Sequence, residues 1–488
     1  MKVTFVQEPE LQFGSGSHVD IRFGLMNYGA LDADSAIGPK RIRLGIVGTP
    51  EAIEGLSSWL SACRTGVAAK PSKRPNLFPR FPGFGPDAPL RADIVLDSRL
   101  NRAVPPGAFE EVCRRSPNHE TYRAISELYL REVAYLEDRR AVDVCVCAYP
   151  DRLVSFLDEG KGVTHSDEDD HTDIIDPVLQ TAGRLDLHDM LKAQAMRFTT
   201  PLQIVRPTTY GKKQSRLSNP RGHRERTLQD EATRAWNFYV ALYYKAGGVP
   251  WRLVRDPSAM TSCYIGIAFY KAIDGSTLLT SSAQVFDERG QGIILMGGPA
   301  RVTKEDKTVH LEGEEAYKLL KKSLVAYRRE HGNYPARVII HKSSRHNEAE
   351  IDGFLKAMQE CSVDPDLADL LGMSKSFTRL FRANIYPPMR GTLLLVSDEE
   401  FVLYTRGSVS FFESYPGMYV PRPLRCRLDR CGQTATFLAA EILGLSKMNW
   451  NNTQFDGDQP ITVRAARQVG SILKYCDGES QSSYRYYM

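Results

Sequence analysis

The sequence predicts an α/β protein of two domains, and two observations support this fold class. In the first half, short apolar runs rich in β-branched residues alternate with amphipathic segments, the pattern of a parallel sheet covered by helices. In the second half, three consecutive strand-like runs precede a helix, a further strand and another helix. The length of 488 residues suffices for two large domains. We place them at 1–255 and 256–488.

The expected elements of the first half begin with the run IRLGIVG at 42–48, which is a strand candidate. A helix over residues 49–63 follows, with Thr49 at the N-cap position. Further strands are expected at 92–98, 142–150 and 201–207, and further helices at 119–138 and 186–198. This alternation indicates a Rossmann-like parallel sheet. No GxGxxG motif follows the first strand, so nothing points to a dinucleotide cofactor.

The second half begins with three runs that are spaced closely enough for an antiparallel meander. The expected elements, in order, are strands at 264–271, 277–287 and 292–298, a helix at 314–332, a strand at 335–343, a helix at 348–360, and strands at 391–398 and 401–407. A three-stranded meander, then a helix, a strand and a helix, is the element order of an RNase H-like fold.

Composition places the chain among soluble globular proteins, with 42% hydrophobic and 25% charged residues. The formal net charge of +4 permits a polyanionic partner without requiring one. The nine cysteines include no CxxC pair, and Cys145 and Cys147 lie in an apolar run, so we expect buried free thiols. There is no secretory signal and no run of about 18 apolar residues. A cytoplasmic location is therefore expected.

A basic loop lies between the two halves. Residues 211–226 hold six cations and the single acid Glu225, a balance of 6 − 1 = +5, among Gly, Ser, Asn and Pro. Such a run is either a solvated face or a phosphate-binding segment, because Lys and Arg neutralise phosphate groups. The cations are Lys212, Lys213, Arg216, Arg221, Arg224 and Arg226.

The helix that follows this loop ends in a distinctive string. Lys245 closes the helix, Gly247 and Gly248 end it, and the residues at 249–251, Val-Pro-Trp, begin the next segment. The string helix–Lys–x–Gly–Gly–x–Pro–Trp resembles the junction between the MID and PIWI domains of Argonaute proteins.

This resemblance extends over the whole chain. Residues 338–354 resemble the PIWI strand that normally ends in an aspartate, with its following helix, and 445–473 resemble the C-terminal PIWI helices and the Asn-rich loop between them. The segment 8–32 resembles the start of short prokaryotic Argonautes, and the length leaves no room for the N and PAZ domains of long ones. The resemblance implies a Rossmann-like MID domain followed by an RNase H-like PIWI domain.

The PIWI nuclease site is a tetrad of carboxylates, because two magnesium ions must be held by hard oxygen ligands. Here Ala268 stands where the family motif has its first aspartate, Ser343 stands at the place of the third, and Ala465 stands at the final ligand position. With three of four ligands replaced, the resemblance implies a PIWI fold without cleavage activity. The nearby His341 is interpreted as a hydrogen-bonded structural group.

The resemblance also implies a MID site for the 5′ phosphate of a guide strand. In the family a tyrosine stacks on the first base, and two lysines and a glutamine contact the phosphate. The matching residues here are Tyr210, Lys212, Lys213, Gln229 and Lys245. The family usually places its first lysine four residues after the tyrosine, where this chain has Gln214. It is therefore open which of Lys212 and Lys213 contacts the phosphate.

Argonautes of this group often bind magnesium beside the 5′ phosphate, with help from the terminal carboxylate. Met488 is the corresponding residue, so magnesium is an expected cofactor, and a frayed terminus is the alternative. Further basic residues are candidates for contacts with the nucleic-acid backbone. They are Arg216, Arg221, Arg224 and Arg226 of the loop and Arg422, Arg425, Arg427, Lys447, Arg464 and Arg467 of the second half.

The function implied by the resemblance is a guide-dependent binding subunit of a prokaryotic defence system. It would hold a small guide, expected to be RNA, recognise complementary single-stranded invader DNA, and activate a separate APAZ-containing effector. The effector is expected to be a TIR or sirtuin-like NADase acting in abortive infection, with a nuclease effector as the alternative. A heterodimer, or a higher oligomer on target binding, is the expected assembly. The competing hypotheses are a guide-directed nuclease with an atypical metal site and a scaffold that binds protein alone.

Overall fold

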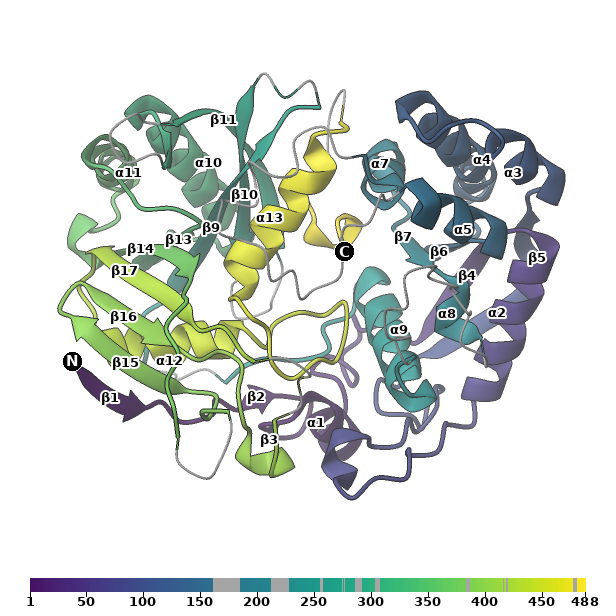
Figure 1. Ribbon diagram of the computed structural model, residues 1–488, viewed down its shortest axis with the longest axis horizontal. Helices are drawn as coiled ribbons and strands as arrows, with labels where there is room; N and C mark the ends of the chain where they lie inside the picture. The colour runs from purple at the N-terminus through teal and green to yellow at the C-terminus, as the bar shows by residue number, and fades with distance from the viewer. Residues whose placement is uncertain are drawn as a thin grey trace.

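The computed structural model describes residues 1–160, 185–211, 228–254, 258–273, 275, 277–285, 292–302, 308–382, 387–415, 417, 420–476 and 481–488. These residues form two lobes that meet at helix α13 (Ile461–Leu473) and at the C-terminal segment (Figure 1). No helix among them is both long and apolar enough to cross a membrane.

The first lobe is built on a parallel four-stranded sheet with the order β5-β4-β6-β7. Its inner strands are almost entirely buried because they have a strand on each side and helices on both faces. This arrangement confirms the Rossmann-like sheet. The strands in that order are β5 (Asp93–Ala103), β4 (Arg41–Gly48), β6 (Val144–Ala148) and β7 (Leu202–Val205).

The helices of the first lobe begin largely where the sequence predicts. Thr49 caps α2, since its hydroxyl oxygen accepts the N–H of Ala52 at 3.3 Å. A small sheet of β2 (Leu11–Gln12), β3 (Ser17–His18) and β8 (Arg252–Leu253) joins the N-terminal segment to the chain that leaves this lobe. The helices are α1 (Ile21–Tyr28), α2 (Pro50–Cys63), α3 (Pro106–Val112), α4 (His119–Asp138), α5 (Asp151–Gly160), α7 (Leu187–Gln194), α8 (Pro207–Tyr210) and α9 (Glu231–Lys245).

The second lobe contains a ten-stranded sheet with the order β1-β15-β16-β17-β14-β13-β9-β10-β11-β12. The three predicted strands form the antiparallel set β9, β10 and β11, and β13 pairs in parallel with β9 and β14. This order confirms the RNase H-like topology. The strands are β1 (Lys2–Phe5), β9 (Ser262–Lys271), β10 (Leu278–Val285), β11 (Gly292–Val302), β12 (Val309–Leu311), β13 (Arg337–Lys342), β14 (Ala368–Lys375), β15 (Thr392–Ser397), β16 (Glu400–Leu403) and β17 (Leu424–Arg430).

Helices cover both faces of this sheet. One face packs against α10 (Gly313–His331) and α11 (Glu348–Glu360), with a core that includes Leu319 and Phe354. The other face packs against α12 (Ala435–Leu445) and α13, which crosses β9 and β10 (Figure 1). The helix α13 also contacts α7 of the first lobe, so it holds the two lobes together.

Four strands of the large sheet escaped the sequence prediction: β1, β12, β14 and β17. The strand β1 pairs with β15. The N-terminal strand therefore belongs to the sheet of the second lobe, although it precedes the predicted boundary at residue 255. The strand β17, LRCRLDR, alternates apolar residues with charged ones that remain partly exposed. The buried strand β14 was also missed. An alternation of apolar and charged residues over so few positions, as in β17, is a weak signal for a strand.

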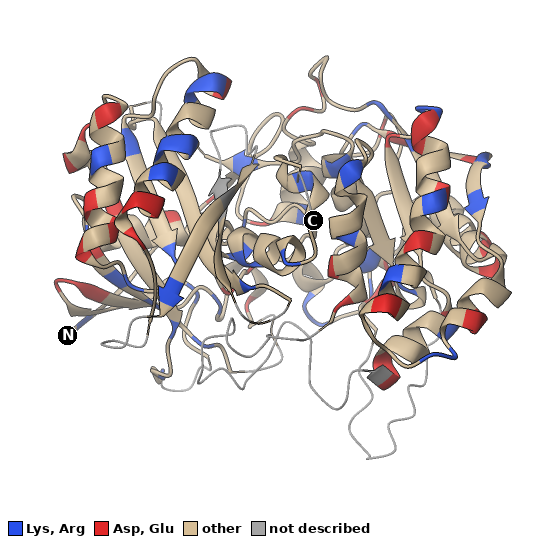
Figure 2. Cartoon of the chain, turned by 90° about the horizontal axis from the view of Figure 1, so that it is seen from above, with Lys and Arg blue, Asp and Glu red and all other residues tan. Residues whose placement is uncertain are grey.

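All nine cysteines are free thiols, and seven of them are buried, including Cys145 and Cys147 on β6. The expectation of buried free thiols is therefore confirmed. Basic and acidic residues are interspersed along the outer helices of both lobes, as Figure 2 shows. No field of single sign covers these outer helices, so they do not themselves form a surface typical of polyanion binding.

Candidate nucleic-acid interface

The last residue of α9 is a buried lysine. The helix begins at the cap residue Asp230, which accepts the N–H of Thr233 at 3.0 Å, and it is buried on most of its sides. Lys245 is 1% exposed, and its Nζ has no hydrogen-bond partner among the described residues. Gly247 follows with φ +98°, a conformation that glycine adopts without strain, and turns the chain away. The fold thus places an unsatisfied amine at the junction of the two lobes.

A second buried lysine, Lys192 on α7, lies beside the first. It is 2% exposed and donates to the main-chain oxygens of Leu202, at 2.6 Å, and of Met488. Burial lowers the pKa of Lys192 to about 7. Burial, and after it the positive charge of Lys192, hold the pKa of Lys245 well below its usual value. We call Lys192 and Lys245 the lysine pair.

Lys192 is a binding-site candidate that was not predicted from the sequence. Its signal was present, because this lysine occupies the apolar face of an amphipathic helix among Leu187, Met190 and Leu191, all of them buried. A cation at such a position is rarely fully buried unless it is paired. Its apolar neighbours Leu191 and Ala193 made this part of the helix look like ordinary core packing.

The C-terminal segment packs against the lysine pair and is not frayed. Tyr486 Oη donates to the main-chain oxygen of Thr199 at 2.7 Å, and Gln468 Nε2 of α13 donates to that of Tyr487 at 2.9 Å. Met488 is 3% exposed, and its main-chain oxygen accepts from Lys192. This segment therefore completes the wall around the two amines.

Gln229 does not join this site. It is exposed, it precedes the first turn of α9, and its side-chain oxygen lies 3.4 Å from Asn237 Nδ2. Lys245 lies at the other end of the same helix of 15 residues, roughly 22 Å away at 1.5 Å per residue. The prediction that both residues contact one phosphate group is therefore wrong. The two residues flank the same helix, but a straight helix of this length holds its first and last turns far apart.

Tyr210 ends α8 at the carboxyl edge of the parallel sheet. Its ring packs on α2, where a Cβ atom added to Gly55 would lie 2.8 Å from Tyr210 Cε2. Burial raises the pKa of Tyr210 to about 12. The structure places this ring at the sheet edge where open α/β folds bind ligands. Its role in stacking on a base stays a prediction.

The candidate cations of the basic loop, Lys212, Lys213, Arg216, Arg221, Arg224 and Arg226, lie outside the described residues. Their assignment stays a prediction from sequence alone. Of the loop, the structure describes only Gly211, whose main-chain oxygen accepts from Arg234 on α9 at 3.0 Å. The loop therefore leaves α8 from a point fixed to the helix that carries Lys245.

The positions matched to the nuclease tetrad lie on neighbouring elements. Ser343 follows β13 and its N–H donates to Ile267 on β9 at 3.0 Å, one residue before Ala268. Ala268 and Ala465 are both fully buried members of one apolar core. Ser281 Oγ, 2.8 Å from the main-chain oxygen of Ala466 and 3.2 Å from that of Ala268, ties α13 to β9. The three matched positions therefore carry two alanines and a serine on neighbouring elements, and the lack of cleavage stays a prediction.

His341 is also buried here. Its Nδ1 lies 2.9 Å from Thr462 Oγ1 on α13, and burial lowers its pKa to about 3. It is therefore a neutral, hydrogen-bonded group that connects β13 with α13, in agreement with its interpretation as structural.

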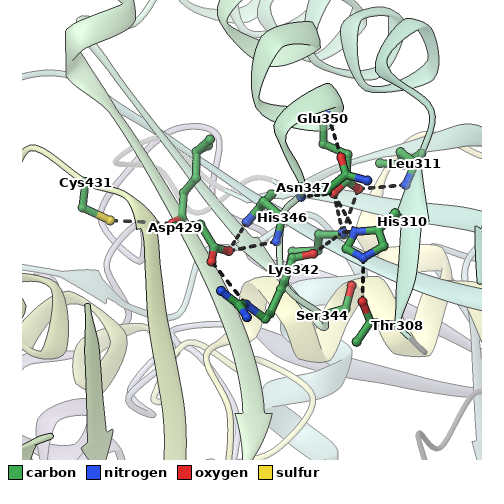
Figure 3. Close-up of polar contacts among 12 residues, drawn as sticks. Thr308, His310, Leu311, Lys342, Ser344, His346, Asn347, Glu350, Asp429 and Cys431 are labelled. Atoms are coloured by element: carbon green, nitrogen blue, oxygen red, sulfur yellow. Dashed lines mark hydrogen bonds and ion pairs between the residues drawn. The ribbon is translucent and has the colours of Figure 1, made fainter. Parts of the chain in front are cut away.

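One residue before Ser343, β13 ends in a fully buried ion pair (Figure 3). Lys342 Nζ lies 2.6 Å from Glu350 Oε1, and both side chains are 0% exposed. The ammonium group also donates to the main-chain oxygens of Val309, at 3.2 Å, and Arg345, at 2.7 Å. We call Lys342 and Glu350 the buried ion pair.

The carboxylate of Glu350 accepts hydrogen bonds from several groups. It accepts the N–H groups of Leu311 at 2.8 Å and Asn347 at 3.0 Å, the latter as part of the capping box of α11. Burial raises its pKa, but the hydrogen bond with His310 and the charge of Lys342 outweigh burial, and the pKa is about 2. The carboxylate is fully engaged with these groups and is not available to a metal ion.

The basic residues proposed for the nucleic-acid backbone divide into two groups. Arg422 lies over the ring of Phe377, 5.4 Å from its centroid, while Arg425 and Arg427 both pair with Glu400, at 2.8 and 3.3 Å. These three guanidinium groups stay candidates. So do Arg464 and Arg467, which project partly exposed from α13.

Lys447 does not belong with them. Its ammonium group is 0% exposed and lies 3.0 Å from Glu8 Oε1, and it also donates to the main-chain oxygens of Pro9 and Val19. Burial lowers its pKa to about 8. The prediction that Lys447 contacts nucleic acid is wrong, because this residue fixes the N-terminal segment to the end of α12.

The sequence matches no protein-family model and no curated protein. The fold matches solved structures. It superposes on Clostridium butyricum Argonaute bound to a guide DNA and a 19-mer target DNA with a TM-score of 0.61 at 16% identity, over 97% of this chain and 53% of that one. Drosophila Piwi matches with a TM-score of 0.58 at 13% identity, over 100% of this chain and 56% of that one. A. aeolicus Argonaute matches with a TM-score of 0.59 at 13% identity, over 100% of this chain and 55% of that one.

These matches show an Argonaute-like fold with a Rossmann-like MID domain and an RNase H-like PIWI domain. The chain spans about half the length of the solved structures that it matches.

Proposed function

We propose that this protein binds a 5′-phosphorylated guide strand, expected to be RNA, and uses it to recognise a complementary nucleic acid, expected to be single-stranded DNA. The observation that carries the proposal is the lysine pair. Lys245 is buried without a hydrogen-bond partner among the described residues, which is unfavourable, and a phosphate dianion would satisfy it and could also accept from Lys192 beside it. The Argonaute-like fold supports this proposal, since the C. butyricum protein of that fold is solved with a guide and a target DNA.

The amines themselves supply the positive charge that the 5′ phosphate requires. Magnesium, the cofactor expected from the resemblance, prefers several oxygen ligands. The oxygens in contact with Lys192 are the main-chain oxygens of Leu202 and Met488, and both already accept from this amine. At the start of α7, Asp186, His188 and Asp189 lie close enough together to hold a metal ion. We propose that Lys192 supplies, at the 5′ phosphate itself, the positive charge that the resemblance expects of magnesium.

We expect the affinity for a 5′-phosphorylated guide to fall as pH rises above 7. The folded protein holds Lys192 with a pKa of about 7, so it has lost this proton at pH 8 and 9. A bound phosphate favours the ammonium form of each lysine. Above the pKa of the free protein, binding must therefore include the uptake of a proton. The affinity then falls by up to about tenfold per pH unit for each lysine. Fluorescence anisotropy with labelled guides from pH 6 to 9 measures this.

A guide with a 5′ hydroxyl is the control for this pH series, because it lacks the group that the amines meet. The pH dependence should be confined to the phosphorylated guide. Equal pH profiles for both guides would show that the lysine pair does not face the phosphate.

We also propose that the protein does not cleave its target. Restoring two ligands with Ala268→Asp and Ser343→Asp is expected to leave guide-dependent cleavage undetectable, even with manganese. The third position is still Ala465, and Lys342 holds the nearby Glu350 in the buried ion pair. Ala268 is fully buried, so an aspartate there is also expected to lower stability. Cuts in a labelled target that depend on the guide would contradict the proposal.

Finally, we propose that target recognition is passed to a separate APAZ-containing effector, of the TIR or sirtuin-like NADase class, in defence against invading nucleic acid. The support is the resemblance in sequence. Co-purification with the product of the neighbouring gene, followed by measurement of NAD⁺ with and without guide and target, tests it. A partner that degrades DNA instead would favour the nuclease alternative, and no co-purifying partner would contradict the proposal.

A further inference from the structure

A pocket of about 630 Å³ opens between the two lobes. The end of α9 and the turn after it form one wall, the start of β11 and the end of α10 form the second, and the C-terminal segment Ser482–Arg485 forms the third. Neither Lys192 nor Lys245 lines it. The pocket is therefore separate from the lysine pair, although both use α9 and the C-terminal segment.

Two guanidinium groups in this pocket have no carboxylate partner among the described residues. Arg485 contacts the ring of Tyr486 at 5.3 Å, but its Nε is buried without a hydrogen bond. Arg329 lies exposed at the rim, in the last turn of α10. Glu330 is the single acid in the lining. Because a buried guanidinium nitrogen without an acceptor is unfavourable, the pocket favours an anionic group that takes two hydrogen bonds.

The rest of the lining has a different character. Tyr244 and Tyr327 line the pocket with 6% and 7% of their surface exposed, and Ile293 and Leu295 add further apolar surface. A volume of this size at a domain interface is typical of sites for small organic ligands, and it exceeds what a simple phosphate ion needs. The lining therefore fits a ligand with a flat apolar part and an anionic end.

We propose that this pocket binds a nucleoside phosphate. The phosphate lies at Arg485 and Arg329, and the base lies against the side chains of Tyr244 and Tyr327. Arginine pairs well with phosphate because its planar fork donates two parallel hydrogen bonds. This ligand is neither the guide nor the target, so the proposal goes beyond the proposed function and does not depend on it.

Isothermal titration of the full-length protein with ADP tests the proposal. We expect saturable binding, weakened by about tenfold or more in Arg485→Gln and in Arg329→Gln, the loss typical of one charge-assisted contact. The matched control is Arg328→Gln. Arg328 is adjacent on α10, but it lies over the ring of Tyr334 and does not line the pocket. This variant should bind ADP like the unaltered protein.

Two further measurements separate the alternatives. Inorganic pyrophosphate should bind much more weakly than ADP, and equal affinity would overturn the assignment of a nucleoside. Loss of ADP binding in Lys245→Met with full binding in Arg485→Gln would place ADP at the lysine pair and overturn the proposal, as would the absence of saturable binding. Since Arg329 is exposed, its variant tests the pocket even if Arg485→Gln unfolds.

Guide binding measured on the same variants keeps this proposal distinct from the proposed function. If the protein binds a phosphorylated guide but not ADP, only the proposal of a nucleoside phosphate in the pocket is contradicted. If the protein binds ADP as described but no guide, only the proposed guide-binding function is contradicted.

Discussion

Replacing Lys342 with methionine is expected to lower the free energy of unfolding by about 3–5 kcal/mol, the usual cost of removing one partner of a buried ion pair. Glu350 would remain buried without its cation, and its oxygens could not reach water. The loss should appear in urea and thermal unfolding followed by circular dichroism, as an earlier transition of the second lobe. A change below about 1 kcal/mol would show that water reaches the pair.

Two controls define this effect. Lys318→Met removes an exposed ammonium group 3.0 Å from Glu315, and it should change stability far less than Lys342→Met, because solvent screens surface pairs. The double variant Lys342→Met with Glu350→Gln should recover part of the loss, because it leaves no unpaired charge in the core. If the double variant is as unstable as the sum of its single changes, the two residues do not act as a pair.

Replacing Lys245 with methionine should have opposite effects on binding and on stability. Affinity for a 5′-phosphorylated guide should fall by about 30-fold, or about 2 kcal/mol, the loss of one charge-assisted contact. The free protein should become more stable, because methionine fills the same space without an amine that lacks a hydrogen bond. Guide titration and thermal unfolding of one preparation measure both quantities.

A guide with a 5′ hydroxyl should bind the Lys245→Met protein almost as well as the unaltered protein. If the substitution weakens both guides equally and lowers the melting temperature, Lys245 supports the structure of the junction and is not a binding group. An opposite change in the two quantities is the expected sign of a residue retained for a ligand.

The sequence predicted the two folds because their elements carry strong local signals. The buried strands β4 and β9 are almost continuous apolar runs, and α2 and α11 begin at recognisable caps. The strand β17 was missed because its arginines form pairs with residues on a neighbouring strand. Such pairs depend on register, which a local pattern does not contain.

The candidate site was predicted only in part, for a related reason. Lys245 could be assigned because the residues around it form a recognisable string. Lys192 and Met488 reach it from other parts of the chain, and only the packing of α7 and the C-terminal segment brings them together. Conversely, Lys447 and Gln229 looked suitable by residue type, but one is buried against Glu8 and the other lies at the wrong end of α9.

The pairing of β1 with β15 has a consequence for synthesis of the chain. Lys2 lies opposite Leu395, so β1 waits during synthesis for a strand made almost four hundred residues later. Contacts of such long sequence separation form late and slowly. During this interval, the exposed apolar side chains of Val3 and Phe5 have no sheet beside them and are accessible to chaperones or to other chains. This edge of the sheet is therefore completed only after β15 has been made.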